Sequence, residues 1–181
     1  LLDLYEAYKN IKYQISNSKE TDQKSKLKDI KLRIIGEGPL KNVLASQIRN
    51  DNFLDSVTIE KKKYEEMPKV YREADIFVLP SKRTDTWEEQ YGMVLVEAMA
   101  SGLPIVAYDT GAISEVIGSA GILIKETDKR NLVTSIKHLI KVEGLRVKLG
   151  KMGRERAEKE FDAKKTATKI KNIYLQIAKS A

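Results

Sequence analysis

Short apolar runs alternate along the chain with segments in which apolar residues recur at helical spacing. The runs predict strands at residues 30–35, 57–59, 76–79, 104–107 and 121–124. Helical spacing predicts helices at residues 1–15, 40–50, 64–74, 92–101, 128–141, 143–160 and 163–179, and residues 16–28 predict an exposed loop. Strands that alternate with helices of this length are typical of an α/β fold with a doubly wound parallel sheet.

The most apolar stretch is residues 87–106, which predicts a short buried helix followed by a strand. Within residues 92–101 the only charged side chain is Glu97. An isolated ionised carboxylate is costly to bury, so we expect Glu97 to reach a cleft, meet a cation or bind hydroxyl donors. From spacing alone, an exposed Glu97 or one paired with a buried Arg is the more common arrangement and stays open.

The start of this helix predicts a ligand site. Gly92 opens the helix, so the amides of the next three residues lack helical acceptors and favour an anion: Met93, Val94 and Leu95. Glu89 lies eight residues before Glu97, in the loop that leads into the same end. The loops after four of the predicted strands meet at this rim, and ligands of doubly wound sheets bind beyond the carboxyl ends of strands.

Length and composition limit the class of protein. The 181 residues suffice for one domain with a sizeable core. The chain has no cysteine, which excludes disulfides and thiolate metal sites. Because no apolar run approaches the roughly 18 residues of a membrane span and no signal peptide is visible, we expect a cytoplasmic protein. Leu1 stands inside a helical pattern without a leader, which indicates a fragment of a longer polypeptide.

The net charge is +7, from 33 basic and 26 acidic residues. Basic and acidic residues are interleaved and no motif with stacked aromatic residues occurs, so we do not expect nucleic acid as a partner. The charge is compatible with a weak peripheral contact to an anionic membrane surface. Residues 85–88 have the wrong spacing for a metal pair and no H-E-x-x-H sequence exists, so we expect no metal.

Two glycine-containing turns are weaker candidates. Gly36 and Gly38 follow a predicted strand, as in a dinucleotide fingerprint, but Lys41 occupies the position of the third glycine. They are either a turn that lets backbone approach a ligand or a structural turn. The turn at residues 109–112 either directs amides at a phosphate or simply begins a helix. The single histidine, His138, is predicted to be a surface residue.

Residues 89–107, EQYGMVLVEAMASGLPIVA, resemble the E-x7-E region of retaining, nucleotide-sugar-dependent glycosyltransferases with the two-domain GT-B architecture. Residues 33–39, RIIGEGP, and 71–81, YREADIFVLPS, are similar to two further blocks of that family. Residues 110–115, TGAISE, resemble a fourth block in which Ala112 replaces a glycine. The resemblance covers essentially the whole chain.

The resemblance implies that residues 1–181 are a single Rossmann-like, donor-binding domain, the C-terminal half of a GT-B fold. The first strand, the Arg and Lys that bind the diphosphate, and the N-terminal acceptor domain would precede this chain. The terminal helix at residues 163–180 is expected to pack on that absent domain. Without it we expect little or no transferase activity.

The resemblance also assigns roles to residues. Glu97 matches the residue that grips the ribose hydroxyls, and Glu89 matches the catalytic Glu that contacts the transferred sugar. The amides of Gly92, Met93 and Val94 would lie against the sugar and diphosphate. The complete set of candidate substrate-binding residues is Glu89, Tyr91, Gly92, Met93, Val94, Glu97, Gly36 and Gly38.

The predicted function is retaining, metal-independent transfer, without cofactor, from a nucleotide-diphosphate sugar to a glycan or lipid-linked acceptor. One alternative is a non-catalytic nucleotide-binding or interaction module of the same fold, with Trp87, Tyr91 and the apolar terminal helix on its partner surface. A second is a glycoside hydrolase that uses Glu89 and Glu97 as acid and base. It is disfavoured because such pairs usually face each other from separate elements.

Overall fold

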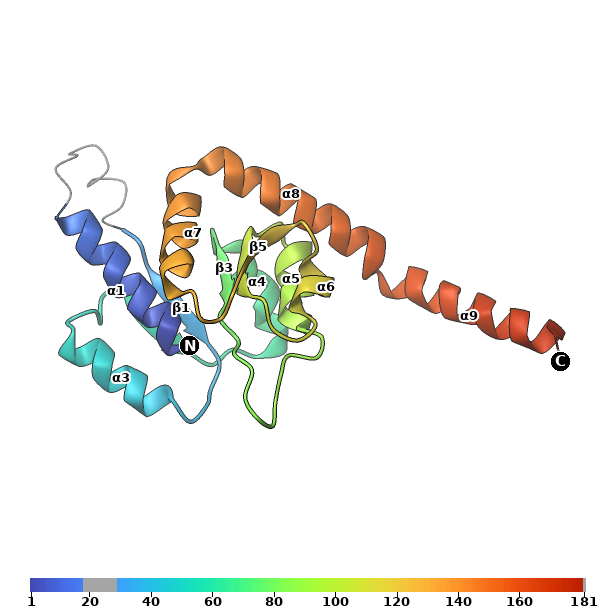
Figure 1. Ribbon diagram of the computed structural model, residues 1–181, viewed down its shortest axis with the longest axis horizontal. Helices are drawn as coiled ribbons and strands as arrows, with labels where there is room; N and C mark the ends of the chain where they lie inside the picture. Colours follow the sequence, from blue (N-terminus) through green and yellow to red (C-terminus); the bar gives the residue numbers. More distant parts are fainter. Residues whose placement is uncertain (18–28, 181) are drawn as a thin grey trace.

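The computed structural model describes residues 1–17 and 29–180 (Figure 1). Helices and strands alternate along them, as predicted, in the order α1 (Leu2–Ser16), β1 (Leu32–Ile35), α3 (Lys41–Asn50), β2 (Val57–Glu60), the 3-10 turn η1 (Tyr64–Glu66), α4 (Met67–Arg72), β3 (Phe77–Leu79), α5 (Met93–Ala100), β4 (Ile105–Tyr108), α6 (Ile113–Ile117), β5 (Gly121–Ile124), α7 (Lys129–Lys141), α8 (Glu143–Glu160) and α9 (Ala163–Ser180). Most of the predicted loop at residues 16–28 lies outside the described residues.

Two predicted elements differ from the structure. The helix predicted at residues 64–74 is divided into η1 and α4, because Pro68 occupies the first turn of α4 and favours a new helix start there. The first strand begins at Leu32 and not at residue 30, where pairing with β2 begins opposite Val57. The remaining boundaries agree within about two residues, the usual uncertainty of helix and strand ends.

The strands are parallel, as predicted, but the described strands form two sheets and not one. β1 pairs with β2, and β4 lies between β3 and β5. All four residues of β4 are buried, whereas those of β3 are only half-buried. Helices cover both faces of β4, which parallel strands require.

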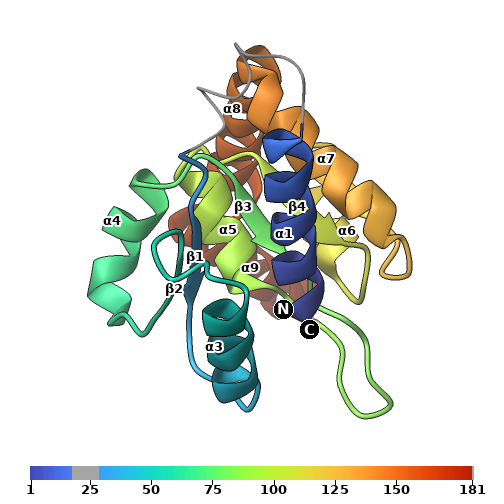
Figure 2. The same cartoon turned by 90° about the vertical axis from the view of Figure 1, so that its left-hand side faces the viewer.

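The faces of β4 pack into two apolar clusters. Val106 and Tyr108 face α1 and α7, while Ile105 and Ala107 face α5 and α6. Helix α1 contributes a further set of side chains to a third cluster, with β1, β2 and α3. In Figure 2, α1 lies in front of the strands. Because it packs on residues of both sheets, α1 holds the two sheets together.

A cavity of about 1330 Å³ separates the two sheets and is lined by residues of β1 and β3. Leu4 and Tyr8 of α1 and Val70 and Tyr71 of α4 also line it. β1 pairs on one side only with β2, and β3 on one side only with β4. Among the described residues, no strand occupies the space between these two unpaired edges.

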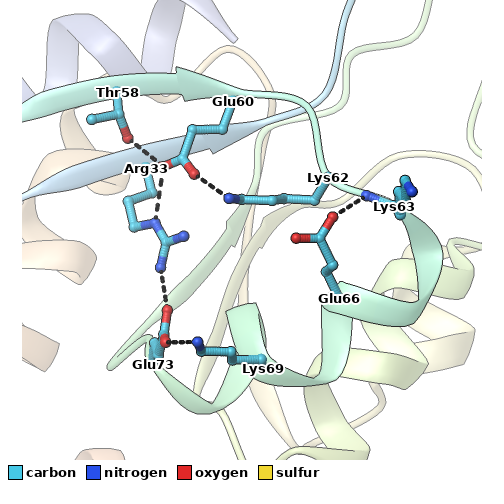
Figure 3. A network of polar contacts seen from close by, with 8 residues as sticks. All are labelled: Arg33, Thr58, Glu60, Lys62, Lys63, Glu66, Lys69 and Glu73. Carbon is cyan, nitrogen blue, oxygen red and sulfur yellow. Dashed lines mark hydrogen bonds and ion pairs between the residues drawn. The ribbon is translucent and has the colours of Figure 1, made fainter.

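Figure 3 shows a network of polar contacts, four of whose residues line the cavity: Arg33, Thr58, Glu60 and Glu73. Arg33 on β1 lies 3.3 Å from Glu60 at the end of β2 and 2.9 Å from Glu73 at the end of α4. Hydrogen bonds from Lys62, Thr58 and Arg33 lower the pKa of Glu60 to about 2. The network therefore fixes the end of β2 to β1 and α4.

Helix α8 packs along α5 and α7, whereas α9 projects away from the remainder of the chain (Figure 1). Several apolar side chains of α9 are exposed: Ile170, Ile173, Tyr174, Leu175 and Ile177. Among the described residues, no helix has both the length and the apolar character that crossing a membrane requires.

Candidate functional site

Helix α5 is defined by glycines at both ends. Gly92 adopts the left-handed conformation, with φ 69° and ψ 56°, and turns the chain into the helix. At the other end the amide of Gly102 donates to Met99 and that of Leu103 to Ala98. This is a Schellman motif, which requires the positive φ of Gly102. Both ends of the apolar helix are therefore fixed by the sequence.

The beginning of α5 brings Glu89 and the predicted amides together. One carboxylate oxygen of Glu89 accepts a hydrogen bond from the Gly92 amide at 3.0 Å. The Leu95 amide, predicted to be free, donates to the Gly92 carbonyl at 2.8 Å. In the part of the chain that the structure describes, the amides of Met93 and Val94 have no protein acceptor. These two amides remain available at the positive end of the helix.

The turn at residues 109–112 holds the backbone of Glu89. The Ala112 amide donates to the Glu89 carbonyl at 2.9 Å. Gly111 packs so closely that a Cβ there would lie 2.0 Å from the same carbonyl oxygen. The Thr110 hydroxyl donates to the Ser81 carbonyl at 3.0 Å. Of the two interpretations left open by the sequence, the structure shows the helix start: α6 begins at Ile113 directly after the turn, and the Ala112 amide is occupied by the Glu89 carbonyl.

Glu97 is half-buried and accepts a hydrogen bond from the Tyr71 hydroxyl at 2.7 Å. Tyr71 is only 4% exposed, and its burial together with the Glu97 carboxylate raises the pKa of Tyr71. The partner of Glu97 is therefore a hydroxyl donor, and not a buried Arg. The second oxygen of Glu97 accepts no hydrogen bond within the described residues.

Gly36 and Gly38 line a smaller cavity of about 230 Å³, and no residue of α5 lines it. This cavity shares four lining residues with the large cavity: Leu1, Ile34, Ile35 and Leu40. A Cβ at Gly36 or Gly38 would meet nothing within 4 Å, so the turn is open. Lys61 crosses it by pairing with Glu37 at 2.7 Å.

Tyr91 is half-exposed, and its ring lies edge-on against Phe161 at 6.1 Å, where α8 meets α9. His138 is exposed, as predicted. Among the described residues, no three His, Asp or Glu side chains gather in a group that could hold a metal ion.

Residues 4–156 match the sequence profile of a family described as Glycosyl transferases group 1. The chain belongs to this family. It is 33% identical over 152 residues to the sulfoquinovosyl transferase of Arabidopsis thaliana, a match that covers 81% of the chain and 28% of that protein.

Two solved structures share the fold. Sucrose-phosphate synthase of Thermosynechococcus elongatus is 25% identical with a TM-score of 0.69, over 83% of this chain and 39% of that one. The C-terminal domain of a group 1 glycosyltransferase from Francisella tularensis is 23% identical with a TM-score of 0.65, over 84% of this chain and 77% of that domain. The fold is the Rossmann-like C-terminal domain of GT-B glycosyltransferases, as the resemblance implied. The chain spans between 28% and 42% of the length of the first curated relatives it matches.

Several residues of the candidate site were not assigned to it from the sequence. Tyr71 belongs to one of the quoted blocks and to a predicted helix, but neither assigned it a role at the site. Ala112 and Thr110 contact the Glu89 loop through a backbone amide and a hydroxyl, which leave no pattern in the sequence. The position of residues 109–112 between a strand and a helix, and the block of residues 110–115 quoted for the family, pointed to this turn but not to its contact with Glu89.

Proposed function

We propose that this chain is the donor-binding half of a retaining, metal-independent glycosyltransferase that uses a nucleotide-diphosphate sugar. The observation that carries the proposal is the arrangement at α5. Glu89, two unoccupied amides and Glu97 belong to one short helix and the loop before it. This end faces the carboxyl edge of parallel strands, where doubly wound folds bind ligands.

The chemistry of each group suits a part of such a donor. The Tyr71 hydroxyl orients Glu97, whose carboxylate can accept from two vicinal ribose hydroxyls at once. The amides of Met93 and Val94, at the positive end of a helix, would stabilise the leaving diphosphate. Glu89, held by Gly92 and Ala112, would contact hydroxyls of the transferred sugar.

We further propose that an upstream strand fills the cavity between β1 and β3. Two unpaired parallel edges face this cavity, and an added strand would join the two sheets into one. Such a strand would lead through α1 to β1, the right-handed crossover that parallel neighbours favour. The much greater length of the curated relatives supports a further domain that binds the glycan or lipid-linked acceptor.

The exposed apolar side of α9 would pack on that further domain, as the resemblance implies. Helix α9 also carries five lysines and no acidic residue: Lys164, Lys165, Lys169, Lys171 and Lys179. Its charge supports, in addition, a weak peripheral contact with an anionic membrane surface.

Thermal unfolding with UDP, GDP, ADP and their sugar conjugates tests the donor site. A nucleotide at about 100 times its Kd should raise the free energy of unfolding by about 2.7 kcal/mol. We expect one base to be preferred and its effect to be lost in Glu97→Gln. Glu88→Gln is the matched control, because Glu88 pairs with Arg83 in the same loop and should bind the nucleotide normally.

The test is repeated with a longer chain that includes the natural sequence upstream of Leu1. Stabilisation only in the longer chain would support both the donor site and the added strand. If neither chain responds to any nucleotide at millimolar concentration, or if Glu97→Gln responds as the wild type does, the proposed donor site is wrong.

A further inference from the structure

Asp3, in the first turn of α1, is only 7% exposed, and its carboxylate contacts three other segments. The Tyr108 hydroxyl, at the end of β4, donates to it at 2.9 Å. The ammonium group of Lys82, in the loop after β3, lies 2.6 Å away. That of Lys129, at the start of α7, lies 2.8 Å away. One buried carboxylate thus joins four parts of the carboxyl edge of the sheet.

The charge of Asp3 is stable at neutral pH. Burial by itself would raise the pKa of Asp3, but hydrogen bonds from Lys129, Lys82 and Tyr108 outweigh burial and lower it to about 2. Removing the negative charge while keeping the shape would leave two ammonium groups without their anion. All three contacts would then weaken together.

Two of the residues that contact Asp3 are close in sequence to Thr110 and Ser81, which are joined by a hydrogen bond. Lys82 is the neighbour of Ser81, and Tyr108 stands two residues before Thr110. The Thr110 hydroxyl donates to the Ser81 carbonyl at 3.0 Å. Asp3 therefore fixes both chain segments that this hydrogen bond connects, the loop after β3 and the end of β4.

The same turn reaches Glu89 directly. Two residues after Thr110, the Ala112 amide donates to the Glu89 carbonyl, and the Glu89 carboxylate in turn accepts from Gly92. Displacement of Thr110 or of the loop after Ser81 would change both hydrogen bonds. Every step from Asp3 to Glu89 is thus a direct contact or one or two residues of connected backbone.

We propose that Asp3 is a positioning residue that clamps the loop after β3 and the end of β4, and thereby holds Glu89 in place. As far as a ligand is concerned, this inference rests on the proposed donor site.

Asp51 offers a matched control. It also accepts from a tyrosine hydroxyl, Tyr5 at 2.8 Å, and pairs with a lysine, Lys9 at 3.1 Å, but these contacts join α1 to the end of α3 and not to the Glu89 loop.

Hydrogen exchange of the Gly92 and Ala112 amides tests the clamp without any ligand, because both amides donate to Glu89. In Asp3→Asn we expect both to exchange at least about five-fold faster, while amides of β1 keep their rates. In Asp51→Asn the two reporter amides should exchange as in the wild type. Unchanged reporters in Asp3→Asn, or equal acceleration in both variants, would overturn the proposal.

A second pair of variants covers the case in which Asp3→Asn fails to fold. Lys82→Ala removes the contact to the loop before Glu89, whereas Lys129→Ala removes only the contact to α7. The side chains of Lys82 and Lys129 are 45% and 62% exposed, so we expect neither change to disturb the core. The reporter amides should exchange faster in Lys82→Ala alone. The reverse order would contradict the clamp.

Binding of the preferred nucleotide and of its sugar conjugate gives a functional measurement. In Asp3→Asn the affinity gained from the sugar should fall by about five-fold, because Glu89 contacts the sugar, while affinity for the nucleotide alone stays within about two-fold. In a Glu89→Gln background, Asp3→Asn should cause no further loss of the affinity gained from the sugar. If the wild type binds no nucleotide even in the longer chain that includes the sequence upstream of Leu1, the proposed function is refuted, and hydrogen exchange still decides whether Asp3 positions Glu89.

Discussion

A buried Tyr hydroxyl needs an acceptor, and Tyr71 finds it in Glu97, the only charged side chain of α5. The carboxylate is thereby held in one orientation at the edge of the core. Glu89 is fixed differently, by amides of Gly92 and Ala112. At the scale of residues, hydrogen bonds from one hydroxyl and two backbone amides therefore hold the two glutamates of the candidate site.

The first prediction concerns the close approach at Gly111. In Gly111→Ala the new Cβ would meet the Glu89 carbonyl at 2.0 Å, and the positive φ of 54° would add backbone strain. We expect the free energy of unfolding to fall by about 3 kcal/mol, measured by urea denaturation. Gly102→Ala has a positive φ but no atom within 4 Å, so it should cost only about 1 kcal/mol. Equal losses would show that the contact with Glu89 is unimportant.

The second prediction concerns acid. The folded pKa of Asp3, about 2, lies below its usual 3.8, so the stability contributed by Asp3 is present above about pH 4 and is lost as pH falls toward 2. The difference in unfolding free energy between wild type and Asp3→Asn should therefore shrink between about pH 5 and about pH 2.5. Urea titrations across this range measure it. A difference that stays constant with pH would refute the assignment.

At the scale of elements, α8 determines how α5 is held. Gly150 and Gly153 of α8 face the end of α5 and let the two backbones approach. A Cβ at Gly150 would lie 2.1 Å from the carbonyl oxygen of Gly102, which follows the end of α5. The position of α5, and with it Glu97, is thus coupled to a helix far away in the sequence.

Gly150→Ala is the third prediction. Because the obstacle is backbone and cannot rotate away, we expect α8 to shift and the free energy of unfolding to fall by about 2 kcal/mol. Gly144→Ala, in the same helix with nothing within 4 Å, should instead be neutral or slightly stabilising. Thermal unfolding of the two variants provides the comparison. A stable Gly150→Ala would contradict the close packing.

At the scale of the whole molecule, two parallel sheets are joined chiefly by α1, over a cavity of about 1330 Å³. The unpaired edges of β1 and β3 weaken this region, because edge strands lack part of their hydrogen bonding. The described side chains of helix α9 are exposed, so α9 contributes little to the core.

The fourth prediction therefore concerns the removal of residues 163–181. The truncated chain should keep its midpoint of thermal unfolding within about 2 °C, because no buried apolar area is lost. It should also associate less, since the exposed apolar side of α9 is gone. Removal of residues 142–181, which include α8, should instead unfold the chain. Loss of stability on removing α9 alone would show that α9 packs on the domain.

The local sequence determined the parts of this protein that depend on short-range physics. Period and turn residues gave the alternation of helices and parallel strands, and Gly92 and Gly102 gave the ends of α5. The motif around Glu89 and Glu97 gave the family, because its spacing is carried by a single helix and its loop.

Only the tertiary structure decided which groups meet. The partner of Glu97 lies 26 residues away, and that of Tyr108 lies 105 residues away, so no local pattern encodes either. The division of the sheet between β1 and β3 was also invisible, because strand pairing is set by long-range packing and not by the apolar run of each strand. The spacing of apolar residues determines the helices and strands, whereas the packing of distant segments around α5 brings the residues of the candidate site together.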